Sequence, residues 1–433
     1  MTFEAKRLGD VAEIIGGGTP STKDAGNWDG DIPWLTPKDL STFEGIYIDR
    51  GSRSITEQGF KTSSAKMLPT GAVLYTSRAP IGYVAIASNP ISTNQGFKSL
   101  ILKDGYVPEF VFYLLKASKS EIEAHASGGT FAEISAKALS DVVLRFPPQV
   151  QQQAISKLLK SLDEKIAANN AISKTLEDIA QTIYKSWFID FDPVKAKMAG
   201  GKPAGMDAAT AALFPDSMVE SEAGLIPRGW EVSALISLVD SISDGDWIES
   251  KDQSSEGYRL LQIGNIGLGE FVESGKERYV SQETFKRLRC TEIMPGDVLV
   301  ARMPEPTGRS WFVDSLVQPA ITSVDVAIIR AHPSRHSNRY VSMFLNLPST
   351  LKLMESLQTG STRQRIKRTY IETLRIITPD AHVLAEFDGI TEKLFGLSDS
   401  LRKESRVLKG IRDSLLPRLI SGELQIPEEM LAS

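Results

Sequence analysis

The chain repeats itself, and this repeat limits what it can fold into more than any other feature of the sequence. The segment ISAKALSDVVLRFPP (134–148) aligns with IKRTYIETLRIITPD (366–380) at a constant spacing of 232 residues, which places Ile134 on Ile366. The aligned positions are apolar in both copies although most of the other residues differ. Self-similarity of this kind predicts two copies of one fold that carry different surfaces.

Two further pairs of segments follow in the same order. LPTGAVLYTSRAPIG (68–82) aligns with IMPGDVLVARMPEPTG (293–308), and SGGT (127–130) lies opposite TGST (359–362). Short β-type runs separated by Gly and Pro fill the first part of each copy, and each copy ends in a strand-like run before a proline. Each copy is therefore expected to be an α/β domain.

After each proline the apolar residues change from the spacing of a strand to that of a helix. Both seams step by three and four residues, as Ile155, Leu159, Leu162 and Ile166 do in the first copy and Phe387, Ile390, Leu394, Leu397 and Leu401 do in the second. This heptad pattern favours two long helices that pair as an antiparallel coiled coil. Two unrelated amphipathic helices, each packed on its own domain, are the alternative.

The sequence thus predicts an α+β fold in which two homologous α/β domains are separated by two long helices that form an antiparallel coiled coil, with a pseudo-twofold internal repeat. The expected boundaries are 1–148 for the first domain, 149–190 for the first helical region, 191–228 for a linker rich in Ala, Gly and Pro, 229–379 for the second domain and 380–425 for the second helical region. A helix over 149–187 would be a rod of about 58 Å, enough to hold two domains about one or more DNA turns apart.

Composition restricts the class of protein without naming it. The 433 residues carry a net charge of −5, which does not by itself indicate nucleic-acid binding, but the segment TGSTRQRIKRTY (359–370) holds four cations and no anion. Cys290 is the only cysteine, so neither an intramolecular disulfide nor a cysteine-based zinc site is expected. No apolar run of about 18 residues and no signal peptide are evident, and a cytoplasmic location is expected.

Several segments resemble one known family. GGGTPST (16–22), GDIPWLTPKDL (30–40), SSAKMLPTGAVLYTSRAPIGYVAIA (63–87) and TNQGFKSL (93–100) resemble the target-recognition domain of Type I restriction-modification specificity subunits. LEDIAQTIYKSWFIDFDPVKAK (176–197) and LLPRLISGELQIP (415–427) look like the conserved helices of that family. The resemblance covers nearly the whole chain, in the order recognition domain, helix, recognition domain, helix.

The resemblance implies a non-catalytic subunit that reads a bipartite target in double-stranded DNA. Two modification (methyltransferase) subunits and the restriction (translocase and nuclease) subunits would be its partners, and together they would methylate adenine or cut DNA. S-adenosylmethionine, ATP and Mg would belong to those partners, and no cofactor or metal is expected in this chain. The second domain departs from the first where contacts would lie, so no base preference carries over.

Candidate DNA-binding residues are the cations, amides and threonines in or beside Gly- and Pro-rich loops, because Arg or Lys reads guanine and Asn or Gln reads adenine. They are Thr19, Lys38, Arg78, Asn94, Gln95, Lys98 and Thr130 in the first domain, and Asn265, Arg302, Arg309, Arg363, Arg365, Lys367 and Arg368 in the second. The basic run 363–368 is the strongest candidate for a phosphate contact. For each of these residues the alternative is a solvated surface residue or a turn former.

A second group of residues is expected to face partner subunits. It comprises apolar and aromatic residues near the helix ends: Ile179, Ile183, Tyr184, Trp187, Phe188, Leu415 and Leu419. Tryptophans are more often core residues, but the position of Trp187 at the end of a heptad seam favours an interface.

Motifs for catalysis are missing from the sequence. It contains no GxxxxGK[ST] loop, no HExxH and no Asn-Pro-Pro-aromatic motif of the amino-methyltransferases. Two other hypotheses remain open: a coiled-coil adaptor whose globular heads bind protein, and a non-catalytic remnant of a fused restriction-methylation enzyme.

Overall fold

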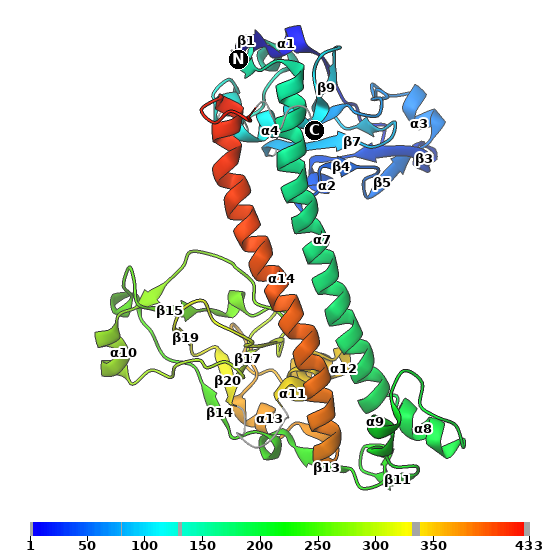
Figure 1. Cartoon of the computed structure of the whole chain (residues 1–433), viewed down its shortest axis with the longest axis vertical. Helices are drawn as coiled ribbons and strands as arrows, with labels where there is room; N and C mark the ends of the chain where they lie inside the picture. The colour runs from blue at the N-terminus through cyan, green and yellow to red at the C-terminus, as the bar shows by residue number, and fades with distance from the viewer. Residues whose placement is uncertain (1–2, 79, 129–131, 331–337, 428–433) are drawn as a thin grey trace. The chain divides into compact units, whose positions relative to one another are not determined.

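The computed structural model describes residues 3–78, 80–128, 132–330 and 338–427. These residues form two compact units, one made of residues 1–171 and 402–433 and the other of residues 172–401. Two long helices, α7 (Gln149–Phe188) and α14 (Ala381–Ser421), contribute residues to both units. Each unit therefore combines one folded domain with a part of each long helix (Figure 1).

The first unit is built on a five-stranded sheet in the order β2-β9-β6-β7-β4. These strands are β2 (Ala12–Gly16), β9 (Lys98–Leu102), β6 (Val73–Ser77), β7 (Ile81–Ala87) and β4 (Tyr47–Ile48). Every residue of β6 is buried, and helix α4 (Pro108–Ala117) packs on β7 with six consecutive buried residues, from Phe110 to Leu115. The sheet and α4 enclose the main apolar core of this unit.

A smaller sheet lies next to the large one, with the order β5-β3-β8. Its strands are β5 (Arg53–Ile55), β3 (Trp28–Leu35) and β8 (Ser92–Thr93), and β3 and β8 run parallel with Leu35 opposite Thr93. Helix α2 (Pro37–Ser41) follows β3 at once, and helix α3 (Glu57–Lys61) follows β5. Threonines begin both helices, because the Thr36 and Thr56 hydroxyls are suited to cap their first backbone amides.

The two ends of the first domain meet in an antiparallel pair, β1 (Glu4–Arg7) with β10 (Val143–Phe146). Helices α1 (Leu8–Val11), α5 (Lys119–Glu123) and α6 (Ala136–Asp141) complete this unit. Pro147 and Pro148 end β10 and lead directly into α7, because proline cannot extend a paired strand but is accepted at the start of a helix.

The second unit repeats this plan, as the sequence predicts. A four-stranded sheet, β14-β20-β17-β18, and a three-stranded sheet, β16-β15-β19, correspond to the two sheets of the first unit. Their bounds are β14 (Ser241–Asp244), β20 (Val326–Arg330), β17 (Val298–Ala301), β18 (Ser310–Phe312), β16 (Tyr279–Val280), β15 (Tyr258–Leu261) and β19 (Ala320–Thr322). Strand β13 (Glu231–Ala234) pairs with β21 (Arg375–Thr378) as β1 pairs with β10, and α10 (Gln282–Leu288), α11 (Asn338–Leu345), α12 (Pro348–Ser356) and α13 (Arg368–Glu372) surround the sheets.

The segment expected to be a plain linker is more structured than its composition suggests. It contains α8 (Asp192–Met198), α9 (Ala208–Ala212) and a hairpin of β11 (Met218–Ser221) with β12 (Gly224–Pro227). Phe191, Val194, Phe214 and Ile226 are buried in the core of the second unit. These few apolar residues are widely spaced in the sequence, so no periodic pattern reveals them.

The long helices pack antiparallel in both units. In the first, Asp163 of α7 accepts a hydrogen bond from Arg412 of α14 at 2.5 Å, and Asn169 donates to Glu404 at 2.9 Å. In the second, Glu177 accepts from Ser398 at 2.8 Å. As residue numbers rise along α7, those of its partners on α14 fall, which confirms the antiparallel coiled coil (Figure 1).

Candidate DNA-recognition surface

Three loops of the first unit converge where its two sheets meet. The backbone amide of Gly18 donates to the carbonyl oxygen of Thr93 at 2.9 Å, and the amide of Asn94 donates to that of Leu35 at 2.8 Å. Gly17 is required here, because a Cβ atom on it would lie 2.1 Å from the carbonyl oxygen of Asn94. The loops after β2, β3 and β8 are thereby held together by their backbones.

Polar side chains predicted from the sequence gather at this junction. The Thr19 hydroxyl donates to the side-chain oxygen of Gln95. The Lys98 ammonium lies 3.5 Å from the carbonyl oxygen of Gln95 and 3.6 Å from a carboxylate oxygen of Glu133. Glu133 also accepts from Arg78 at 3.4 Å. The cluster therefore offers amide, hydroxyl, ammonium and guanidinium groups, which are the groups that bind DNA bases and phosphates.

Glu133 reaches the cluster because two backbone hydrogen bonds hold it there. They close a small hydrogen-bonded ring, called the ring below. Ser127 and Glu133 exchange two backbone hydrogen bonds of 3.0 and 2.9 Å, and the amide of Ile134 donates to the carbonyl oxygen of Ser77 at 3.0 Å. Arg78 follows Ser77 directly, so the guanidinium and the carboxylate approach each other from two anchored segments. The side chains of Arg78 and Glu133 are 37% and 39% exposed, which leaves both within reach of a ligand.

The other three candidates of this domain have separate positions. Lys38 is exposed on α2, one residue after Pro37, which lies close to Gly96 beside the cluster. Asn94 forms the turn itself, since its side-chain oxygen accepts from the amide of Gly96 at 2.8 Å. Thr130 lies outside the described residues.

The second unit reproduces this junction in its backbone. The amide of Asp246 donates to the carbonyl oxygen of Thr322 at 2.8 Å, as Gly18 donates to Thr93, and Ser323 donates to Leu261 at 3.0 Å, as Asn94 donates to Leu35. The ring recurs as well, because Thr359 and Arg365 exchange two backbone hydrogen bonds of 2.9 and 3.0 Å.

Asn265 has a structural role that corrects its selection as a base-reading residue. Its side-chain oxygen accepts from the amide of Gln262 at 2.9 Å, and its amide nitrogen donates to the carbonyl oxygen of Val272 at 3.0 Å. Asp39 caps α2 in the same manner by accepting from the amide of Thr36. Asn265 is thus the cap of the equivalent turn, and it is only 5% exposed. A side-chain amide in a Gly-rich segment has the same sequence signature whether it caps a turn or reads a DNA base.

Arg302 and Arg309 also differ from the expectation that they face DNA. Arg302 is 6% exposed and donates to the carbonyl oxygen of Ile366 at 3.1 Å, and it forms an ion pair with Asp244. Arg309 is 9% exposed and donates to four backbone carbonyl oxygens, those of Ile263, Ile266, Met303 and Pro306. Both guanidinium groups connect loops inside the unit, because buried carbonyl oxygens need donors. Burial lowers the pKa of Arg309.

The basic run of the second domain stays at the surface. Arg363, Arg365 and Lys367 are exposed, and Arg365 lies 3.4 Å from Asp325. Arg368 is half-buried, pairs with Glu372 at 3.1 Å and donates to the carbonyl oxygen of Ile242 at 3.3 Å. Three of the four cations therefore present charge to solvent beside the ring that Thr359 and Arg365 close.

Two residues of this surface were missed by sequence reasoning. Glu133 was overlooked because acidic residues were not considered as parts of a DNA site. Trp247 is 71% exposed in the loop after β14, and the sequence analysis did not include it among the candidate residues. The alignment of Gly17 with Gly245 would have placed Trp247 at this junction, but that segment is too divergent to align by sequence alone.

The residues expected to face partner subunits separate into two classes. Tyr184, Trp187 and Phe188 are at most 5% exposed and pack with Phe387, Tyr340 and Trp230 in an aromatic core, which corrects their assignment to an interface. Leu419 is 1% exposed in the core of the first unit, and Leu415 and Ile183 are partly buried against the same cores. Ile179 is 43% exposed and is the one residue of the group open to solvent. The heptad pattern cannot distinguish an aromatic side chain that is buried in the core of its own domain from one that contacts a partner subunit.

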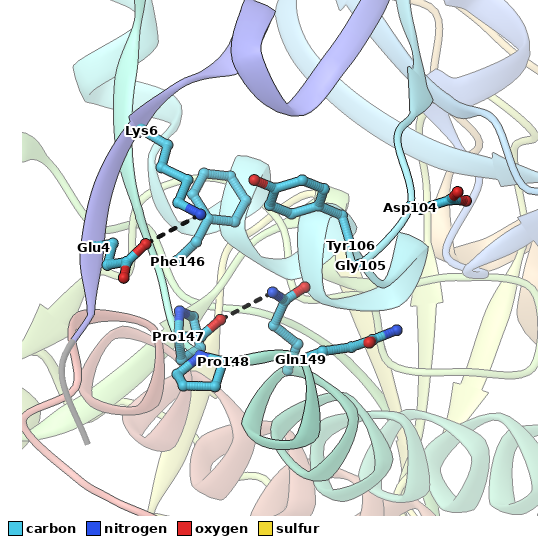
Figure 2. A pocket seen from close by; sticks show the side chains of 10 residues that line it. Glu4, Lys6, Asp104, Gly105, Tyr106, Phe146, Pro147, Pro148 and Gln149 are labelled. Atoms are coloured by element: carbon cyan, nitrogen blue, oxygen red, sulfur yellow. Dashed lines mark hydrogen bonds and ion pairs between the residues drawn. The ribbon is translucent and has the colours of Figure 1, made fainter.

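A hollow of about 330 Å³ opens near the start of α7. Figure 2 shows Tyr106 and Phe146 beside Lys6, whose ammonium pairs with Glu4 at 3.1 Å. Pro147, Pro148 and Gln149 line the other side. The Gln152 side chain is used within the chain, since it donates to the carbonyl oxygen of Pro147 at 2.9 Å and accepts from the amide of Val107 at 3.0 Å.

Neither a metal centre nor a membrane span is found in the part of the chain that the structure describes. Among residues 3–78, 80–128, 132–330 and 338–427, no group of three or more His, Cys, Asp or Glu side chains could hold a metal ion. Within the same residues no helix has the length and apolar character needed to cross a bilayer.

Comparison with known proteins decides the family. Residues 1–178 match the model of the Type I restriction modification DNA specificity domain. The chain is 33% identical over 431 residues to the Type I restriction enzyme MjaIX specificity subunit of Methanocaldococcus jannaschii, which covers 98% of this chain and 94% of that protein. The chain belongs to the Type I specificity-subunit family. The HindI specificity subunit of Haemophilus influenzae is 27% identical, covering 73% of this chain and 78% of that protein.

A solved structure agrees with the Type I specificity-subunit fold. The S subunit of the Type I restriction-modification system from M. genitalium superimposes with a TM-score of 0.60 at 16% identity, covering 97% of this chain and 96% of that one. The duplicated fold is therefore shared where the sequences have diverged widely.

Proposed function

We propose that the chain reads a bipartite target in double-stranded DNA for a Type I restriction-modification complex. The observation that carries this proposal is the repeated junction: the same backbone hydrogen bonds recur in both units, and the side chains they present differ. The domain at 1–148 would read one half of the target and the domain at 229–379 the other. A repeated frame with different side chains is what two readers of unlike half-sites require.

The charges suit this role in spite of the acidic chain. Lys98, Arg78 and the exposed Lys38 supply cations at the first junction, and Arg363, Arg365 and Lys367 supply them at the second. Local cations of this kind supply the phosphate contacts that position a protein on DNA. The net charge of −5 describes the whole chain and does not oppose a local basic surface.

The helices would set the distance between the half-sites and bind the partner subunits. Apolar side chains are exposed along both: Ile172 and Ile179, two turns apart on α7, and Val407 and Ile411, one turn apart on α14. Apolar residues at helical spacing fit an interface with two modification subunits. In this proposal the chain itself catalyses nothing. S-adenosylmethionine, ATP and Mg act in the modification and restriction subunits, and the complex works on DNA in the cytoplasm.

The methylome of host cells with and without the gene tests the proposal. Loss of one bipartite methylated-adenine motif on deletion, and its return on complementation, is the expected result and names both half-sites. If partner subunits are expressed and the methylome does not change, the proposal fails. A protein-binding adaptor would then be tested by gel shift, because DNA binding through phosphates weakens steeply with salt and protein binding does not.

A further inference from the structure

One tryptophan differs from all the others in its environment. The chain has six tryptophans, and Trp28, Trp34, Trp187, Trp230 and Trp311 are each at most 9% exposed. Trp247 is 71% exposed. An indole ring left in water forgoes the favourable burial that such a large apolar surface provides, so its exposure calls for a reason.

Its position in the repeat supplies that reason. Gly245 would place a Cβ atom 2.2 Å from the carbonyl oxygen of Ser323, as Gly17 would do with Asn94 in the first unit. The amide of the next residue, Asp246, donates to Thr322 as Gly18 donates to Thr93. Trp247 therefore occupies in the second domain the position that Thr19 occupies in the first.

The loop that carries Trp247 is anchored on both sides. The Asp246 carboxylate accepts from the amide of Thr291 at 3.0 and 3.2 Å. After Trp247, Asp252 accepts from the amide of Glu249 at 3.2 Å and from Arg287 at 2.5 Å. The hydrogen bonds on both sides of Trp247 therefore fix the loop in a conformation that leaves the indole in solvent.

Two of the three carboxylates near Trp247 are neutralised by cations. Glu249 pairs with Lys251 at 2.8 Å, and Asp252 pairs with Arg287. The third carboxylate, that of Asp246, accepts from the backbone amide of Thr291 instead of pairing with a cation, and the large exposed apolar group of the loop is the Trp247 ring.

We propose that Trp247 is a specificity-determining DNA contact of the second recognition domain, which packs its ring against a base of the second half-site. Apolar side chains recognise the thymine methyl group in the major groove, and aromatic rings stack on bases that leave the helix. The first domain carries instead the polar pair of Thr19 and Gln95 at this position. This difference would make the two domains select different bases with the same backbone. The inference rests on the proposed function.

Fluorescence of the full-length chain tests it directly, because Trp247 is the one tryptophan open to a soluble quencher. Acrylamide should quench the free protein mainly through Trp247, and W247F should remove that component. A duplex with both half-sites should reduce the quenching constant severalfold. A duplex with the second half-site scrambled should protect much less. An unchanged quenching constant, with binding of the duplex verified by gel shift, would overturn the inference.

The methylome of cells expressing W247A gives a second readout, with W247F as the conservative variant and unfolding temperature as the check on folding. W247A should relax or abolish recognition at one half-site and weaken binding of the target duplex about tenfold or more, and W247F should retain part of it. T19A is the matched control and should affect the other half-site. Unchanged recognition by W247A refutes the inference while wild-type methylation still supports the proposed function. Unchanged DNA affinity with loss of all methylation would mark Trp247 as a partner-protein contact and also refute it.

Discussion

At the scale of single residues, the two units differ most clearly in the ring that each forms from backbone hydrogen bonds. Glu133 closes the ring of the first unit and Arg365 closes that of the second. Glu133 lies beside Arg78 and Lys98, whereas Arg365 lies beside Asp325. One position in the shared frame therefore carries opposite charges, each matched by its own neighbours.

Replacing Glu133 by glutamine should strengthen non-specific DNA binding. The E133Q variant loses the carboxylate that Arg78 and Lys98 face, which leaves both cations for phosphate. We expect severalfold tighter binding to a duplex without the target at low salt, measured by fluorescence anisotropy. E164Q makes the same change of charge on the exposed surface of α7. Equal effects of both variants would show that only net charge matters.

Asp246 should make the stability of the second unit depend on pH. Burial raises the pKa of its carboxyl to about 6, against a lowering by the amide of Thr291. Because the folded state raises this pKa, the contribution to stability is complete below the ordinary value of 3.8 and is lost as pH rises through about 6.

The D246N variant should therefore be more stable than the wild type at pH 7.5, by about 1 kcal/mol once partial exposure is considered, and the difference should vanish near pH 4. Urea unfolding of both proteins across this range measures it. D216N changes an exposed carboxylate and should show no such trend. A D246N variant less stable than the wild type at pH 7.5 would contradict the assignment.

At the scale of elements, the helix pair shows what an apolar pattern can and cannot predict. The heptad spacing indicated both long helices and their antiparallel pairing. It did not predict every buried position, because Leu397 of the predicted seam is 50% exposed whereas Ser173 and Ser398 are buried. It did not reveal the polar contact of Asp163 with Arg412 and Tyr113, nor that Tyr184, Trp187 and Phe188 close a core. Those contacts join segments far apart in the sequence, which a local period does not record.

Asp163 and Arg412 should be strongly coupled in stability. Asp163 accepts from Arg412 at 2.5 Å and from the Tyr113 hydroxyl at 2.7 Å, and both charged side chains are at most 21% exposed. The D163A variant leaves Arg412 paired only with Asp413, whose side chain is 63% exposed, and removes the acceptor of the Tyr113 hydroxyl. It should cost about 3 kcal/mol in the free energy of unfolding. A double-mutant cycle with R412A, followed by urea unfolding, should give a coupling of about 2 kcal/mol.

Arg418 and Glu423 provide the comparison for that cycle. Their ion pair at 3.0 Å is largely exposed, with side chains 48% and 65% accessible. The R418A variant should change stability by less than about 1 kcal/mol. If R412A and R418A lower the free energy of unfolding by similar amounts, the contact of α7 with α14 does not depend on the pairing of Arg412 with Asp163.

At the scale of the whole molecule, the duplication was predictable and the roles of individual side chains were only partly so. Ile134 and Ile366 remain aligned because each is buried in the core of its unit. Gly71 and Gly296 occupy equivalent places because both have a positive φ, which favours glycine. Residues at the candidate surface diverge, so nothing in the sequence separates Arg302, which holds a buried loop, from Arg363, which is exposed. Burial of a polar residue depends on the three-dimensional arrangement of its neighbours.

The salt dependence of DNA binding should report the surface cations of the second unit. Each phosphate contact contributes about −0.9 to the slope of log K against log salt concentration. Removing two contacts in the R363A/K367A variant should make the slope less steep by about 2, with the unfolding temperature unchanged. Titrations at several salt concentrations measure it, and the double variant K393A/K403A on α14 is the control. An unaltered slope would remove the basic run from the DNA surface.

The rings closed by Ser127 with Glu133 and by Thr359 with Arg365 depend on backbone groups alone. Any residue with a backbone amide can close such a ring, and the fold does not choose between acid and base at this point. A change of side chain at either position therefore leaves both hydrogen bonds of its ring in place. Under the proposed function, such changes would let each domain alter its target preference independently of the other.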